Sequence, residues 1–240
     1  MNLVLDIGNS LLKAGIFKNN NLINYCEFNQ DYYLNIKSIL DKNPITHSIV
    51  ANVAESKNKL IELLSKKTNL IKFDSSLKVP FKNCYQTKNT LGKDRIALVS
   101  NASKEYPKEN VLLIDLGSCI TFDLLNNKNE YIGGSISPGL RMRYRSLNNF
   151  TANLPLIDPK EIDCFIGKNT EDSIHSGIIN GIISELNSTV DKYKSKYKEI
   201  RIILTGGDSK FLFKKIKNGI FANQKFLIFG LNFLIELNKK

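Results

Sequence analysis

Two short segments carry an aspartate followed two residues later by a glycine, in each case after a run of apolar residues. They are residues 3–17, LVLDIGNSLLKAGIF, and residues 112–125, LLIDLGSCITFDLL. The pattern predicts a buried strand, a tight turn and a second strand. Backbone N–H groups in such a turn can bind phosphate, and the strand-end aspartates, Asp6 and Asp115, can face a metal ion or the reacting group. The duplication therefore predicts two related halves around one phosphate-binding cleft.

A structural explanation exists for either segment alone, since an aspartate after a strand is usually a turn former that bonds its own backbone. The two copies, however, share more than the aspartate. Each has a glycine, Gly8 or Gly117, that leaves no side chain in the way of a ligand, and a nearby serine, Ser10 or Ser118. This repeated set favours a phosphate-binding function over turn formation.

Residues 92–95, GKDR, place the carboxylate of Asp94 beside the guanidinium of Arg95, just before an apolar segment predicted to be helical. A carboxylate here could accept a proton from a substrate hydroxyl. The alternative is an N-terminal aspartate stabilised by the helix dipole, with a solvated arginine. The tetrapeptide on its own favours that alternative.

The second half contains further candidate turns. Residues 131–139, YIGGSISPG, predict a strand, a turn and a helix, and residues 202–208, IILTGGD, run from a strand into Gly206 and Gly207. A glycine pair at a strand-to-helix junction lets a ring or a phosphate approach the helix N-terminus, although many such glycines serve packing alone. Thr170, after Gly167, is either a helix N-cap or a substrate contact.

Composition restricts the class of protein. With 240 residues, 42% of them hydrophobic, the chain can bury a substantial core as one large or two small domains. No apolar run is long enough to span a bilayer, so we expect a soluble, cytoplasmic protein with no membrane partner. The four cysteines form no C-x-x-C pair, which argues against a zinc site or a disulfide framework.

The net charge of +11 raises the possibility of a nucleic-acid partner. Most of the basic residues are lysines spread along the chain, which argues against a recognition surface. The one dense basic run, residues 192–198, KYKSKYK, is interpreted as the solvated end of an amphipathic helix that begins near Thr170. We therefore expect no nucleic-acid partner.

Strand and helix patterns alternate along the chain, which predicts an α/β fold. After the first hairpin the expected elements are strands at 22–28, 48–51 and 69–73, helices at 33–40 and 56–67, and an irregular stretch at 75–90. The second half restarts at Val111, so the predicted domains are residues 1–106 and 107–240.

Six motifs in order resemble the type III pantothenate kinases of the actin-like, sugar-kinase-like ATPase superfamily. They are DIGNS at Asp6, GKDR at Gly92, DLGSCITFD at Asp115, GGSISPG at Gly133, GKNT at Gly167 and LTGGD at Leu204. The resemblance implies duplicated actin-like (ribonuclease H-like) domains, each a mixed sheet flanked by helices, with the active site in the cleft between them. It also implies a cytoplasmic homodimer that phosphorylates pantothenate from ATP with Mg²⁺ and a monovalent cation, K⁺ or NH₄⁺, in the first step of coenzyme A biosynthesis.

The resemblance assigns a role to individual residues. Asp94 becomes the proton acceptor, Asp115 the monovalent-cation ligand, and Asp6 faces the metal-bound ATP, with Mg²⁺ held through water. The implied ATP contacts are Asp6, Ile7, Gly8, Asn9, Ser10, Leu11, Leu12, Lys13, Ser118, Gly206 and Gly207. The implied pantothenate contacts are Tyr85, Gly92, Lys93, Asp94, Arg95 and Thr170. Arg95 could meet the pantothenate carboxylate or a phosphate, and its planar fork suits both.

The absence of a G-x-x-x-x-G-K-[ST] segment argues against a P-loop kinase. Two other functions stay open at this point. One is a non-catalytic relative that modulates transcription, against which the intact Asp6, Asp94 and Asp115 argue. The other is a different small-molecule kinase of the same superfamily, which should lack the combination of Tyr85, GKDR and Thr170.

Overall fold

The computed structural model describes residues 1–8, 11–51, 58–213, 216, 220–221 and 224–239. The described residues divide into two compact units, Met1–Pro107 with Lys225–Lys240, and Lys108–Gln224. The final helix, α7 (Phe226–Asn238), packs on helix α3 and strand β1 of the first unit. These units differ from the domains expected from sequence, 1–106 and 107–240, because the C-terminal helix belongs to the first unit.

The first unit is built on a five-stranded sheet with the order β3-β2-β1-β4-β5. Its strands are β1 (Asn2–Ile7), β2 (Leu12–Lys18), β3 (Asn21–Phe28), β4 (His47–Ala51) and β5 (Asn69–Ile71). Strands β1 to β3 are antiparallel, whereas β4 pairs in parallel with β1 and β5 with β4. The unit also contains the helices α1 (Tyr32–Lys42), α2 (Asn58–Lys67) and α3 (Lys93–Glu105), the short strand β6 (Lys82–Asn83) and a 3₁₀ turn at Lys88–Thr90.

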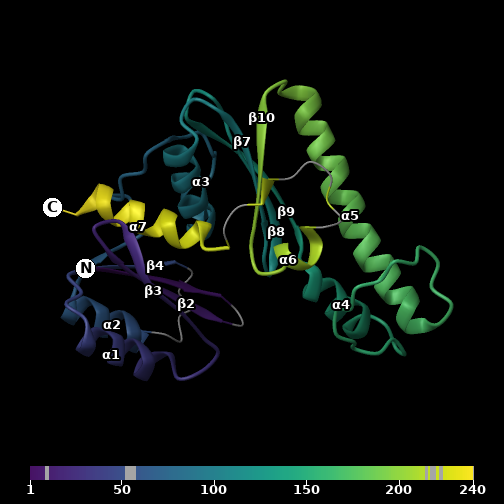
Figure 1. Ribbon diagram of the computed structural model, residues 1–240, viewed down its shortest axis with the longest axis horizontal. Coiled ribbons are helices and arrows are strands. Elements are labelled where there is room, and N and C mark those ends of the chain that lie inside the picture. The colour runs from purple at the N-terminus through teal and green to yellow at the C-terminus, as the bar shows by residue number, and fades with distance from the viewer. Residues whose placement is uncertain (9–10, 52–57, 214–215, 217–219, 222–223, 240) are drawn as a thin grey trace. The chain divides into compact units, whose positions relative to one another are not determined.

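Helices cover both faces of this sheet (Figure 1). Leu3, Leu5 and Ile7 of β1 pack with α1 and α2, whereas Val4 packs with α3 and α7. Successive side chains of a strand point to opposite faces, so Asp6 shares the face of Val4. The two acids of the predicted site in this unit, Asp6 and the Asp94 of α3, thus belong to the same side of the sheet.

A polar network ties β1 to α7. The buried Asn2 side chain donates to Asn232 Oδ1 and to Glu236 Oε1, each at 2.8 Å, and Lys239 Nζ donates to Glu236 Oε1 at 2.6 Å. Burial acts to raise the pKa of Glu236, but the hydrogen bonds from Lys239 and Asn2 outweigh it, so the net pKa is lowered.

The second unit repeats the strand arrangement. Its sheet runs β11-β10-β7-β8-β9, with β7 to β9 antiparallel and β10 parallel to both β7 and β11. The strands are β7 (Asn110–Leu116), β8 (Cys119–Leu125), β9 (Glu130–Pro138), β10 (Ile200–Thr205) and β11 (Ile220–Phe221). The helices are α4 (Leu140–Asn149), α5 (Thr170–Lys196) and α6 (Ser209–Leu212). An antiparallel three-stranded meander extended by parallel strands therefore occurs in both units, and its first two strands are the strand–turn–strand segment that the duplicated motif predicted.

Helix α5 covers one face of this second sheet (Figure 1). Ile174, Ile178, Ile182, Leu186 and Val190 recur every four residues and form its buried stripe, which packs against Leu112, Ile114 and Leu116 of β7. The expected basic run coincides with the C-terminal end of this helix. Within the described residues, we find no helix that is both long and apolar enough to cross a bilayer.

Candidate active site

The first predicted phosphate-binding turn joins β1 to β2. Asp6 lies one residue before the end of β1, is 8% exposed, and pairs across the sheet with Lys13 of β2. The turn is closed by the N–H of Gly8, which donates to the carbonyl oxygen of Leu11 at 2.9 Å. Of the other predicted ATP contacts, Ile7 and Leu12 are buried core residues and Leu11 is 36% exposed, while Asn9 and Ser10 lie outside the described residues.

The second turn joins β7 to β8 and is shorter. Asp115 again lies one residue before the strand end, and the N–H of Gly117 donates to the carbonyl oxygen of Cys119 at 3.1 Å. The last paired residues are Leu116 and Ile120 here, against Ile7 and Leu12 in the first turn, so the second loop is one residue shorter. The two turns are therefore equivalent in their aspartate and glycine but not residue by residue beyond them.

Glycines pack around this second turn because no side chain fits there. A Cβ at Gly139 would lie 2.4 Å from the carbonyl oxygens of both Gly117 and Ser118. A Cβ at Gly206 would lie 2.4 Å from Asp115 Oδ1, and Gly206 also has φ of +97°, in the left-handed region that favours glycine. The structure thus brings Asp115, Ser118 and Gly206 of the predicted site together within the second unit.

The sequence interpretation did not select Gly139 as a site residue, although Pro138-Gly139 after a strand gave a signal for a turn. It also passed over Thr121 of β8, which pairs with Asp115 across the ladder. Gly207, which it did select, has open space at its Cβ position, with no atom of the described residues within 4 Å. Its backbone is therefore accessible to a ligand at the start of α6.

The GKDR segment begins helix α3. Gly92 is the N-cap and Asp94 lies in the first turn, where its Oδ1 accepts from the N–H of Arg95 at 2.8 Å. Asp94 therefore lies at a helix N-terminus, as in the alternative in which the helix dipole stabilises the aspartate and Arg95 is solvated. The other half of that alternative, a solvated arginine, is wrong, because Arg95 is only 5% exposed. Its guanidinium lies over the Tyr85 ring, with Cζ 5.5 Å from the ring centroid.

Three predicted pantothenate contacts, Tyr85, Asp94 and Arg95, are therefore adjacent at one end of α3. The fourth, Gly92, permits this packing, since a Cβ there would lie 2.4 Å from Asp94 Oδ1. The fifth, Lys93, directs its ammonium over the ring of Phe73, 5.8 Å from the centroid.

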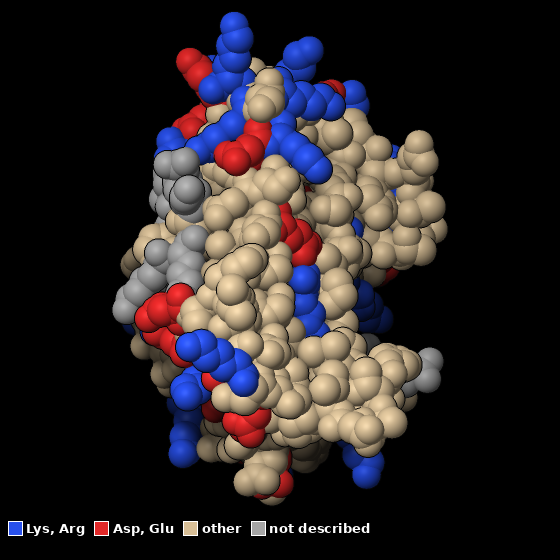
Figure 2. Space-filling view, turned by 90° about the vertical axis from the view of Figure 1, so that its right-hand side faces the viewer, with Lys and Arg blue, Asp and Glu red and all other residues tan. Residues whose placement is uncertain are grey.

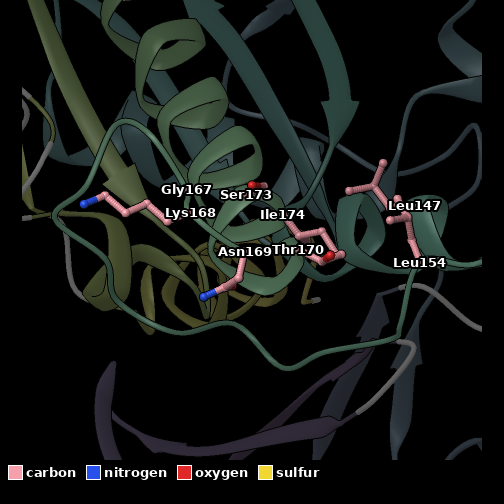
Figure 3. A pocket seen from close by; sticks show the side chains of 8 residues that line it. All are labelled: Leu147, Leu154, Gly167, Lys168, Asn169, Thr170, Ser173 and Ile174. Carbon is pink, nitrogen blue, oxygen red and sulfur yellow. The ribbon is translucent and has the colours of Figure 1, made fainter.

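Thr170 lines a pocket of about 520 Å³ at the start of α5. Leu147 and Leu154 lie at one end of this pocket and Lys168 at the other, with Thr170 between them (Figure 3). Gly167, Asn169, Ser173 and Ile174 complete the lining. One end is apolar and the other polar and cationic, so the pocket suits a small molecule that has both an aliphatic part and an anionic group.

Helix α5 is capped by Asn169, whose side chain accepts from the N–H of Asp172 at 2.8 Å. The alternative in which Thr170 is the N-cap is therefore wrong, and its hydroxyl lies in the pocket lining instead. Tyr144 Oη and His175 Nδ1 are 2.7 Å apart and link α4 to α5. Burial raises the pKa of Tyr144 to about 12, so this hydroxyl keeps its proton at neutral pH.

The acids offer limited metal-binding capacity by themselves. Among the described residues, no three His, Cys, Asp or Glu side chains lie close enough together to hold a metal ion. Asp6 and Asp115 are each a single carboxylate at a strand end. Such sites suit ions whose remaining ligands come from phosphate, water or neutral oxygens, as Mg²⁺ in kinases does.

Comparison with known proteins adds an independent line of information. The family model described as type III pantothenate kinase matches residues 2–192. The type III pantothenate kinase of Christiangramia forsetii is 49% identical to this chain over 241 residues, which cover 100% of this chain and 99% of that protein.

Two solved structures share the fold. A protein described as a Baf family transcriptional activator, from Campylobacter jejuni, gives a TM-score of 0.62 at 23% identity, covering 98% of both chains. The inorganic polyphosphate/ATP-glucomannokinase of Arthrobacter sp. strain KM gives a TM-score of 0.53 at 14% identity, covering 98% of this chain and 97% of that one. At these identities the likeness concerns the fold, and it confirms the predicted α/β, sugar-kinase-like class.

Proposed function

We propose that this chain, which belongs to the type III pantothenate kinase family, transfers the γ-phosphate of ATP to a hydroxyl of pantothenate. The product, 4′-phosphopantothenate, is that of the first step of coenzyme A biosynthesis. The observation that carries the proposal is the full-length similarity to curated type III pantothenate kinases. The neighbouring Tyr85, Asp94 and Arg95 at the start of α3 support it from the side of the substrate.

Asp94 is the proposed proton acceptor. Phosphoryl transfer asks the protein mainly to position the acceptor hydroxyl in line and to neutralise charge on the transferring group. A carboxylate within hydrogen-bond reach of that hydroxyl contributes typically about 10²- to 10⁴-fold. In this protein the N–H of Arg95 fixes Asp94 Oδ1, which orients the carboxylate before substrate arrives.

The two strand-end turns are the proposed phosphate sites. In the first, the backbone around Gly8 and the ammonium of Lys13 provide positive groups, and Asp6 can hold Mg²⁺ through water. In the second, Ser118 and the open backbone at Gly207 are the contacts for ATP. When bound, Mg²⁺ would neutralise charge on the ATP phosphates, and K⁺ or NH₄⁺ near Asp115 would add a further positive charge.

The pocket at the start of α5 provides groups that suit a molecule with an aliphatic part and a carboxylate, both of which pantothenate has. Leu147 and Leu154 provide apolar surface, and Lys168 provides a cation (Figure 3). Thr170 lies between them and is the proposed hydrogen-bonding contact in this pocket.

The decisive assay is ADP release that depends on both ATP and pantothenate, measured in K⁺ and in Na⁺. Asp94→Asn should lower kcat by about 10²-fold or more while the affinity for ATP stays nearly unchanged. Asp41→Asn is a matched control, because Asp41 is half exposed and its one ion pair among the described residues is with the exposed Lys67, at 3.5 Å. Absence of turnover in K⁺ would refute the proposal, and an equal loss of ATP affinity would reassign Asp94 to the nucleotide site.

A panel of other small alcohols in the same assay separates pantothenate from the substrates of related kinases. A transcriptional role would appear instead as salt-sensitive DNA binding without turnover.

A homodimer in the cytoplasm is the proposed state of the enzyme. Figure 2 shows a broad, largely uncharged area, with Lys and Arg side chains crowded at its upper end and others at its lower left. Phe150, Phe165 and Ile166, between α4 and α5, are 87%, 82% and 74% exposed. Exposed apolar residues this close in sequence suit an interface with a second copy. Light scattering should give a dimer, and Phe165→Ser should shift it toward monomer.

A further inference from the structure

Thr121 carries a buried hydroxyl that the fold does not satisfy. The residue is 7% exposed in the middle of β8, and its Oγ1 has no hydrogen-bond partner among the residues that the structure describes. Burying a hydroxyl without a partner is unfavourable, and a valine of the same shape would avoid the penalty. The hydroxyl therefore needs an explanation other than packing.

The position of Thr121 suggests one. It is directly opposite Asp115 in the antiparallel β7–β8 ladder, so both side chains are on the same face of the sheet. Directly opposite Cβ atoms are about 4.5–5.5 Å apart, which places a hydroxyl oxygen and a carboxylate within reach of one ion. This face is the one opposite to α5, because Leu112, Ile114 and Leu116 occupy the α5 side.

Space beside the carboxylate is preserved by Gly206. Any Cβ there would lie 2.4 Å from Asp115 Oδ1, so the chain keeps a side chain out of the immediate surroundings of this oxygen. An unsatisfied buried oxygen next to a carboxylate, with a side-chain-free position beside it, fits a bound cation.

We propose that Thr121 Oγ1 is a ligand of a monovalent cation, together with the carboxylate of Asp115. The proposal deepens the proposed kinase function, which already assigns a cation to Asp115, and it rests on that function. It names the residue that would make the site selective for a weakly hydrated ion.

A monovalent ion fits these ligands better than Mg²⁺ does. One carboxylate and a neutral hydroxyl balance a single positive charge, and no cluster of three acidic, His or Cys side chains is present among the described residues. Mg²⁺ demands near-ideal octahedral geometry and gives up its water reluctantly, whereas Thr121 is enclosed within a strand ladder.

The test compares Thr121→Val, which removes the hydroxyl but keeps the shape, with Thr121→Ser, which keeps the hydroxyl. Thermal unfolding of each full-length protein is followed against KCl at constant ionic strength maintained with choline chloride, both without nucleotide and with Mg²⁺-ADP. For the wild type and Thr121→Ser, K⁺ should raise the Tm in at least one of the two conditions. For Thr121→Val, the K⁺ concentration that gives half of this rise should increase roughly 10-fold or more, since bonds to charged groups have this strength.

A second readout separates a ligand from a merely structural hydroxyl. In choline chloride alone, Thr121→Val should be at least as stable as the wild type, because the unsatisfied hydroxyl is gone. A lower Tm without K⁺ and an unchanged response to K⁺ would overturn the proposal. The proposal is also wrong if the Tm of the wild type does not respond to K⁺ in either condition. It is wrong as well if Mg²⁺ without K⁺ raises the wild-type Tm by the same amount and Thr121→Val abolishes that rise.

These outcomes are independent of the kinase assay. If the wild type phosphorylates pantothenate but Thr121→Val responds to K⁺ as the wild type does, the ligand role is wrong and the function stands. If no pantothenate is phosphorylated, the function is wrong whatever the unfolding curves show.

Discussion

Replacing Gly230 by alanine should disrupt the contact between α7 and α3, the helix that carries Asp94. A Cβ at Gly230 would lie 1.9 Å from the carbonyl oxygen of Ala97 and 2.7 Å from its carbonyl carbon. Non-bonded atoms prefer about 3.5 Å or more, so the two helices must separate by roughly 1.5 Å. The obstructing atoms belong to the backbone and cannot rotate away.

The magnitude follows from two opposing effects. Overpacking of a core costs about 1–3 kcal/mol, and we expect the upper end because backbone must move. Alanine regains about 1 kcal/mol over glycine inside a helix. The net loss is about 2 kcal/mol, which for a chain of this size lowers the Tm by roughly 4–8 °C. Because a misplacement of about 1 Å can cost 10²-fold in rate, kcat should fall as well.

Gly181→Ala is the matched control, since it makes the same change inside α5. Apart from its neighbours and the backbone of its own helix turn, no atom of the described residues lies within 4 Å of the position its Cβ would take. This variant should gain about 0.4–1 kcal/mol and leave kcat unchanged. Differential scanning calorimetry and the ADP-release assay measure both variants. If Gly230→Ala is as stable as Gly181→Ala, the close approach of α7 to α3 is wrong.

Three further variants test other parts of the structure. Gly206→Ala combines a strained positive φ with a clash against the Asp115 carboxylate. Titration calorimetry should therefore show that the affinity for ATP falls by about 10-fold or more. An unchanged affinity would place the ATP site elsewhere. Glu236→Gln should lower the free energy of unfolding by about 1 kcal/mol at pH 7. Because the folded-state pKa of Glu236 is lowered, this difference should vanish as the pH falls through that pKa, and a constant difference would contradict the assignment. Tyr131→Phe removes the 2.7 Å hydrogen bond to the fully buried Asp123 and should lower the free energy of unfolding, measured in urea, by about 2 kcal/mol. An unchanged free energy of unfolding would show that this hydrogen bond does not stabilise the fold.

The parts of the fold that could be predicted are those with a local signal. The alternating and continuous apolar runs around Asp6 and Asp115 located both hairpins, and the glycine after each aspartate located the turns. The Gly206-Gly207 turn was also visible, because a positive φ and a close approach to Asp115 leave glycine as the only residue that fits. The candidate site residues Asp6 and Asp115 could be selected from the sequence because each lies at a strand end that a glycine turn marks.

Other parts depend on long-range packing and leave no local signal. The apolar C-terminal helix could have joined either unit, and long-range contacts such as the close approach of Gly230 to Ala97 and the hydrogen bond from Asn2 to Asn232 place it in the first. Leu154 lines the pocket from an irregular segment without periodicity. The burial of Arg95 likewise depends on Tyr85, ten residues earlier in the chain and brought there by the fold.

The two turns differ in the residue that lies opposite the strand-end aspartate, and this difference affects how each turn could bind phosphate. Asp6 and Asp115 occupy equivalent places in their sheets, but the residue directly opposite is Lys13 in the first unit and Thr121 in the second. A lysine supplies a fixed positive charge, so the first turn can bind phosphate with charge from the chain itself. The second turn has only a neutral oxygen at that position, and on the proposal made above its positive charge comes from a dissociable ion. On this reasoning Thr121→Lys should make the Tm independent of K⁺, whatever the longer side chain costs in packing; a variant that still responds to K⁺ as the wild type does would contradict the assignment.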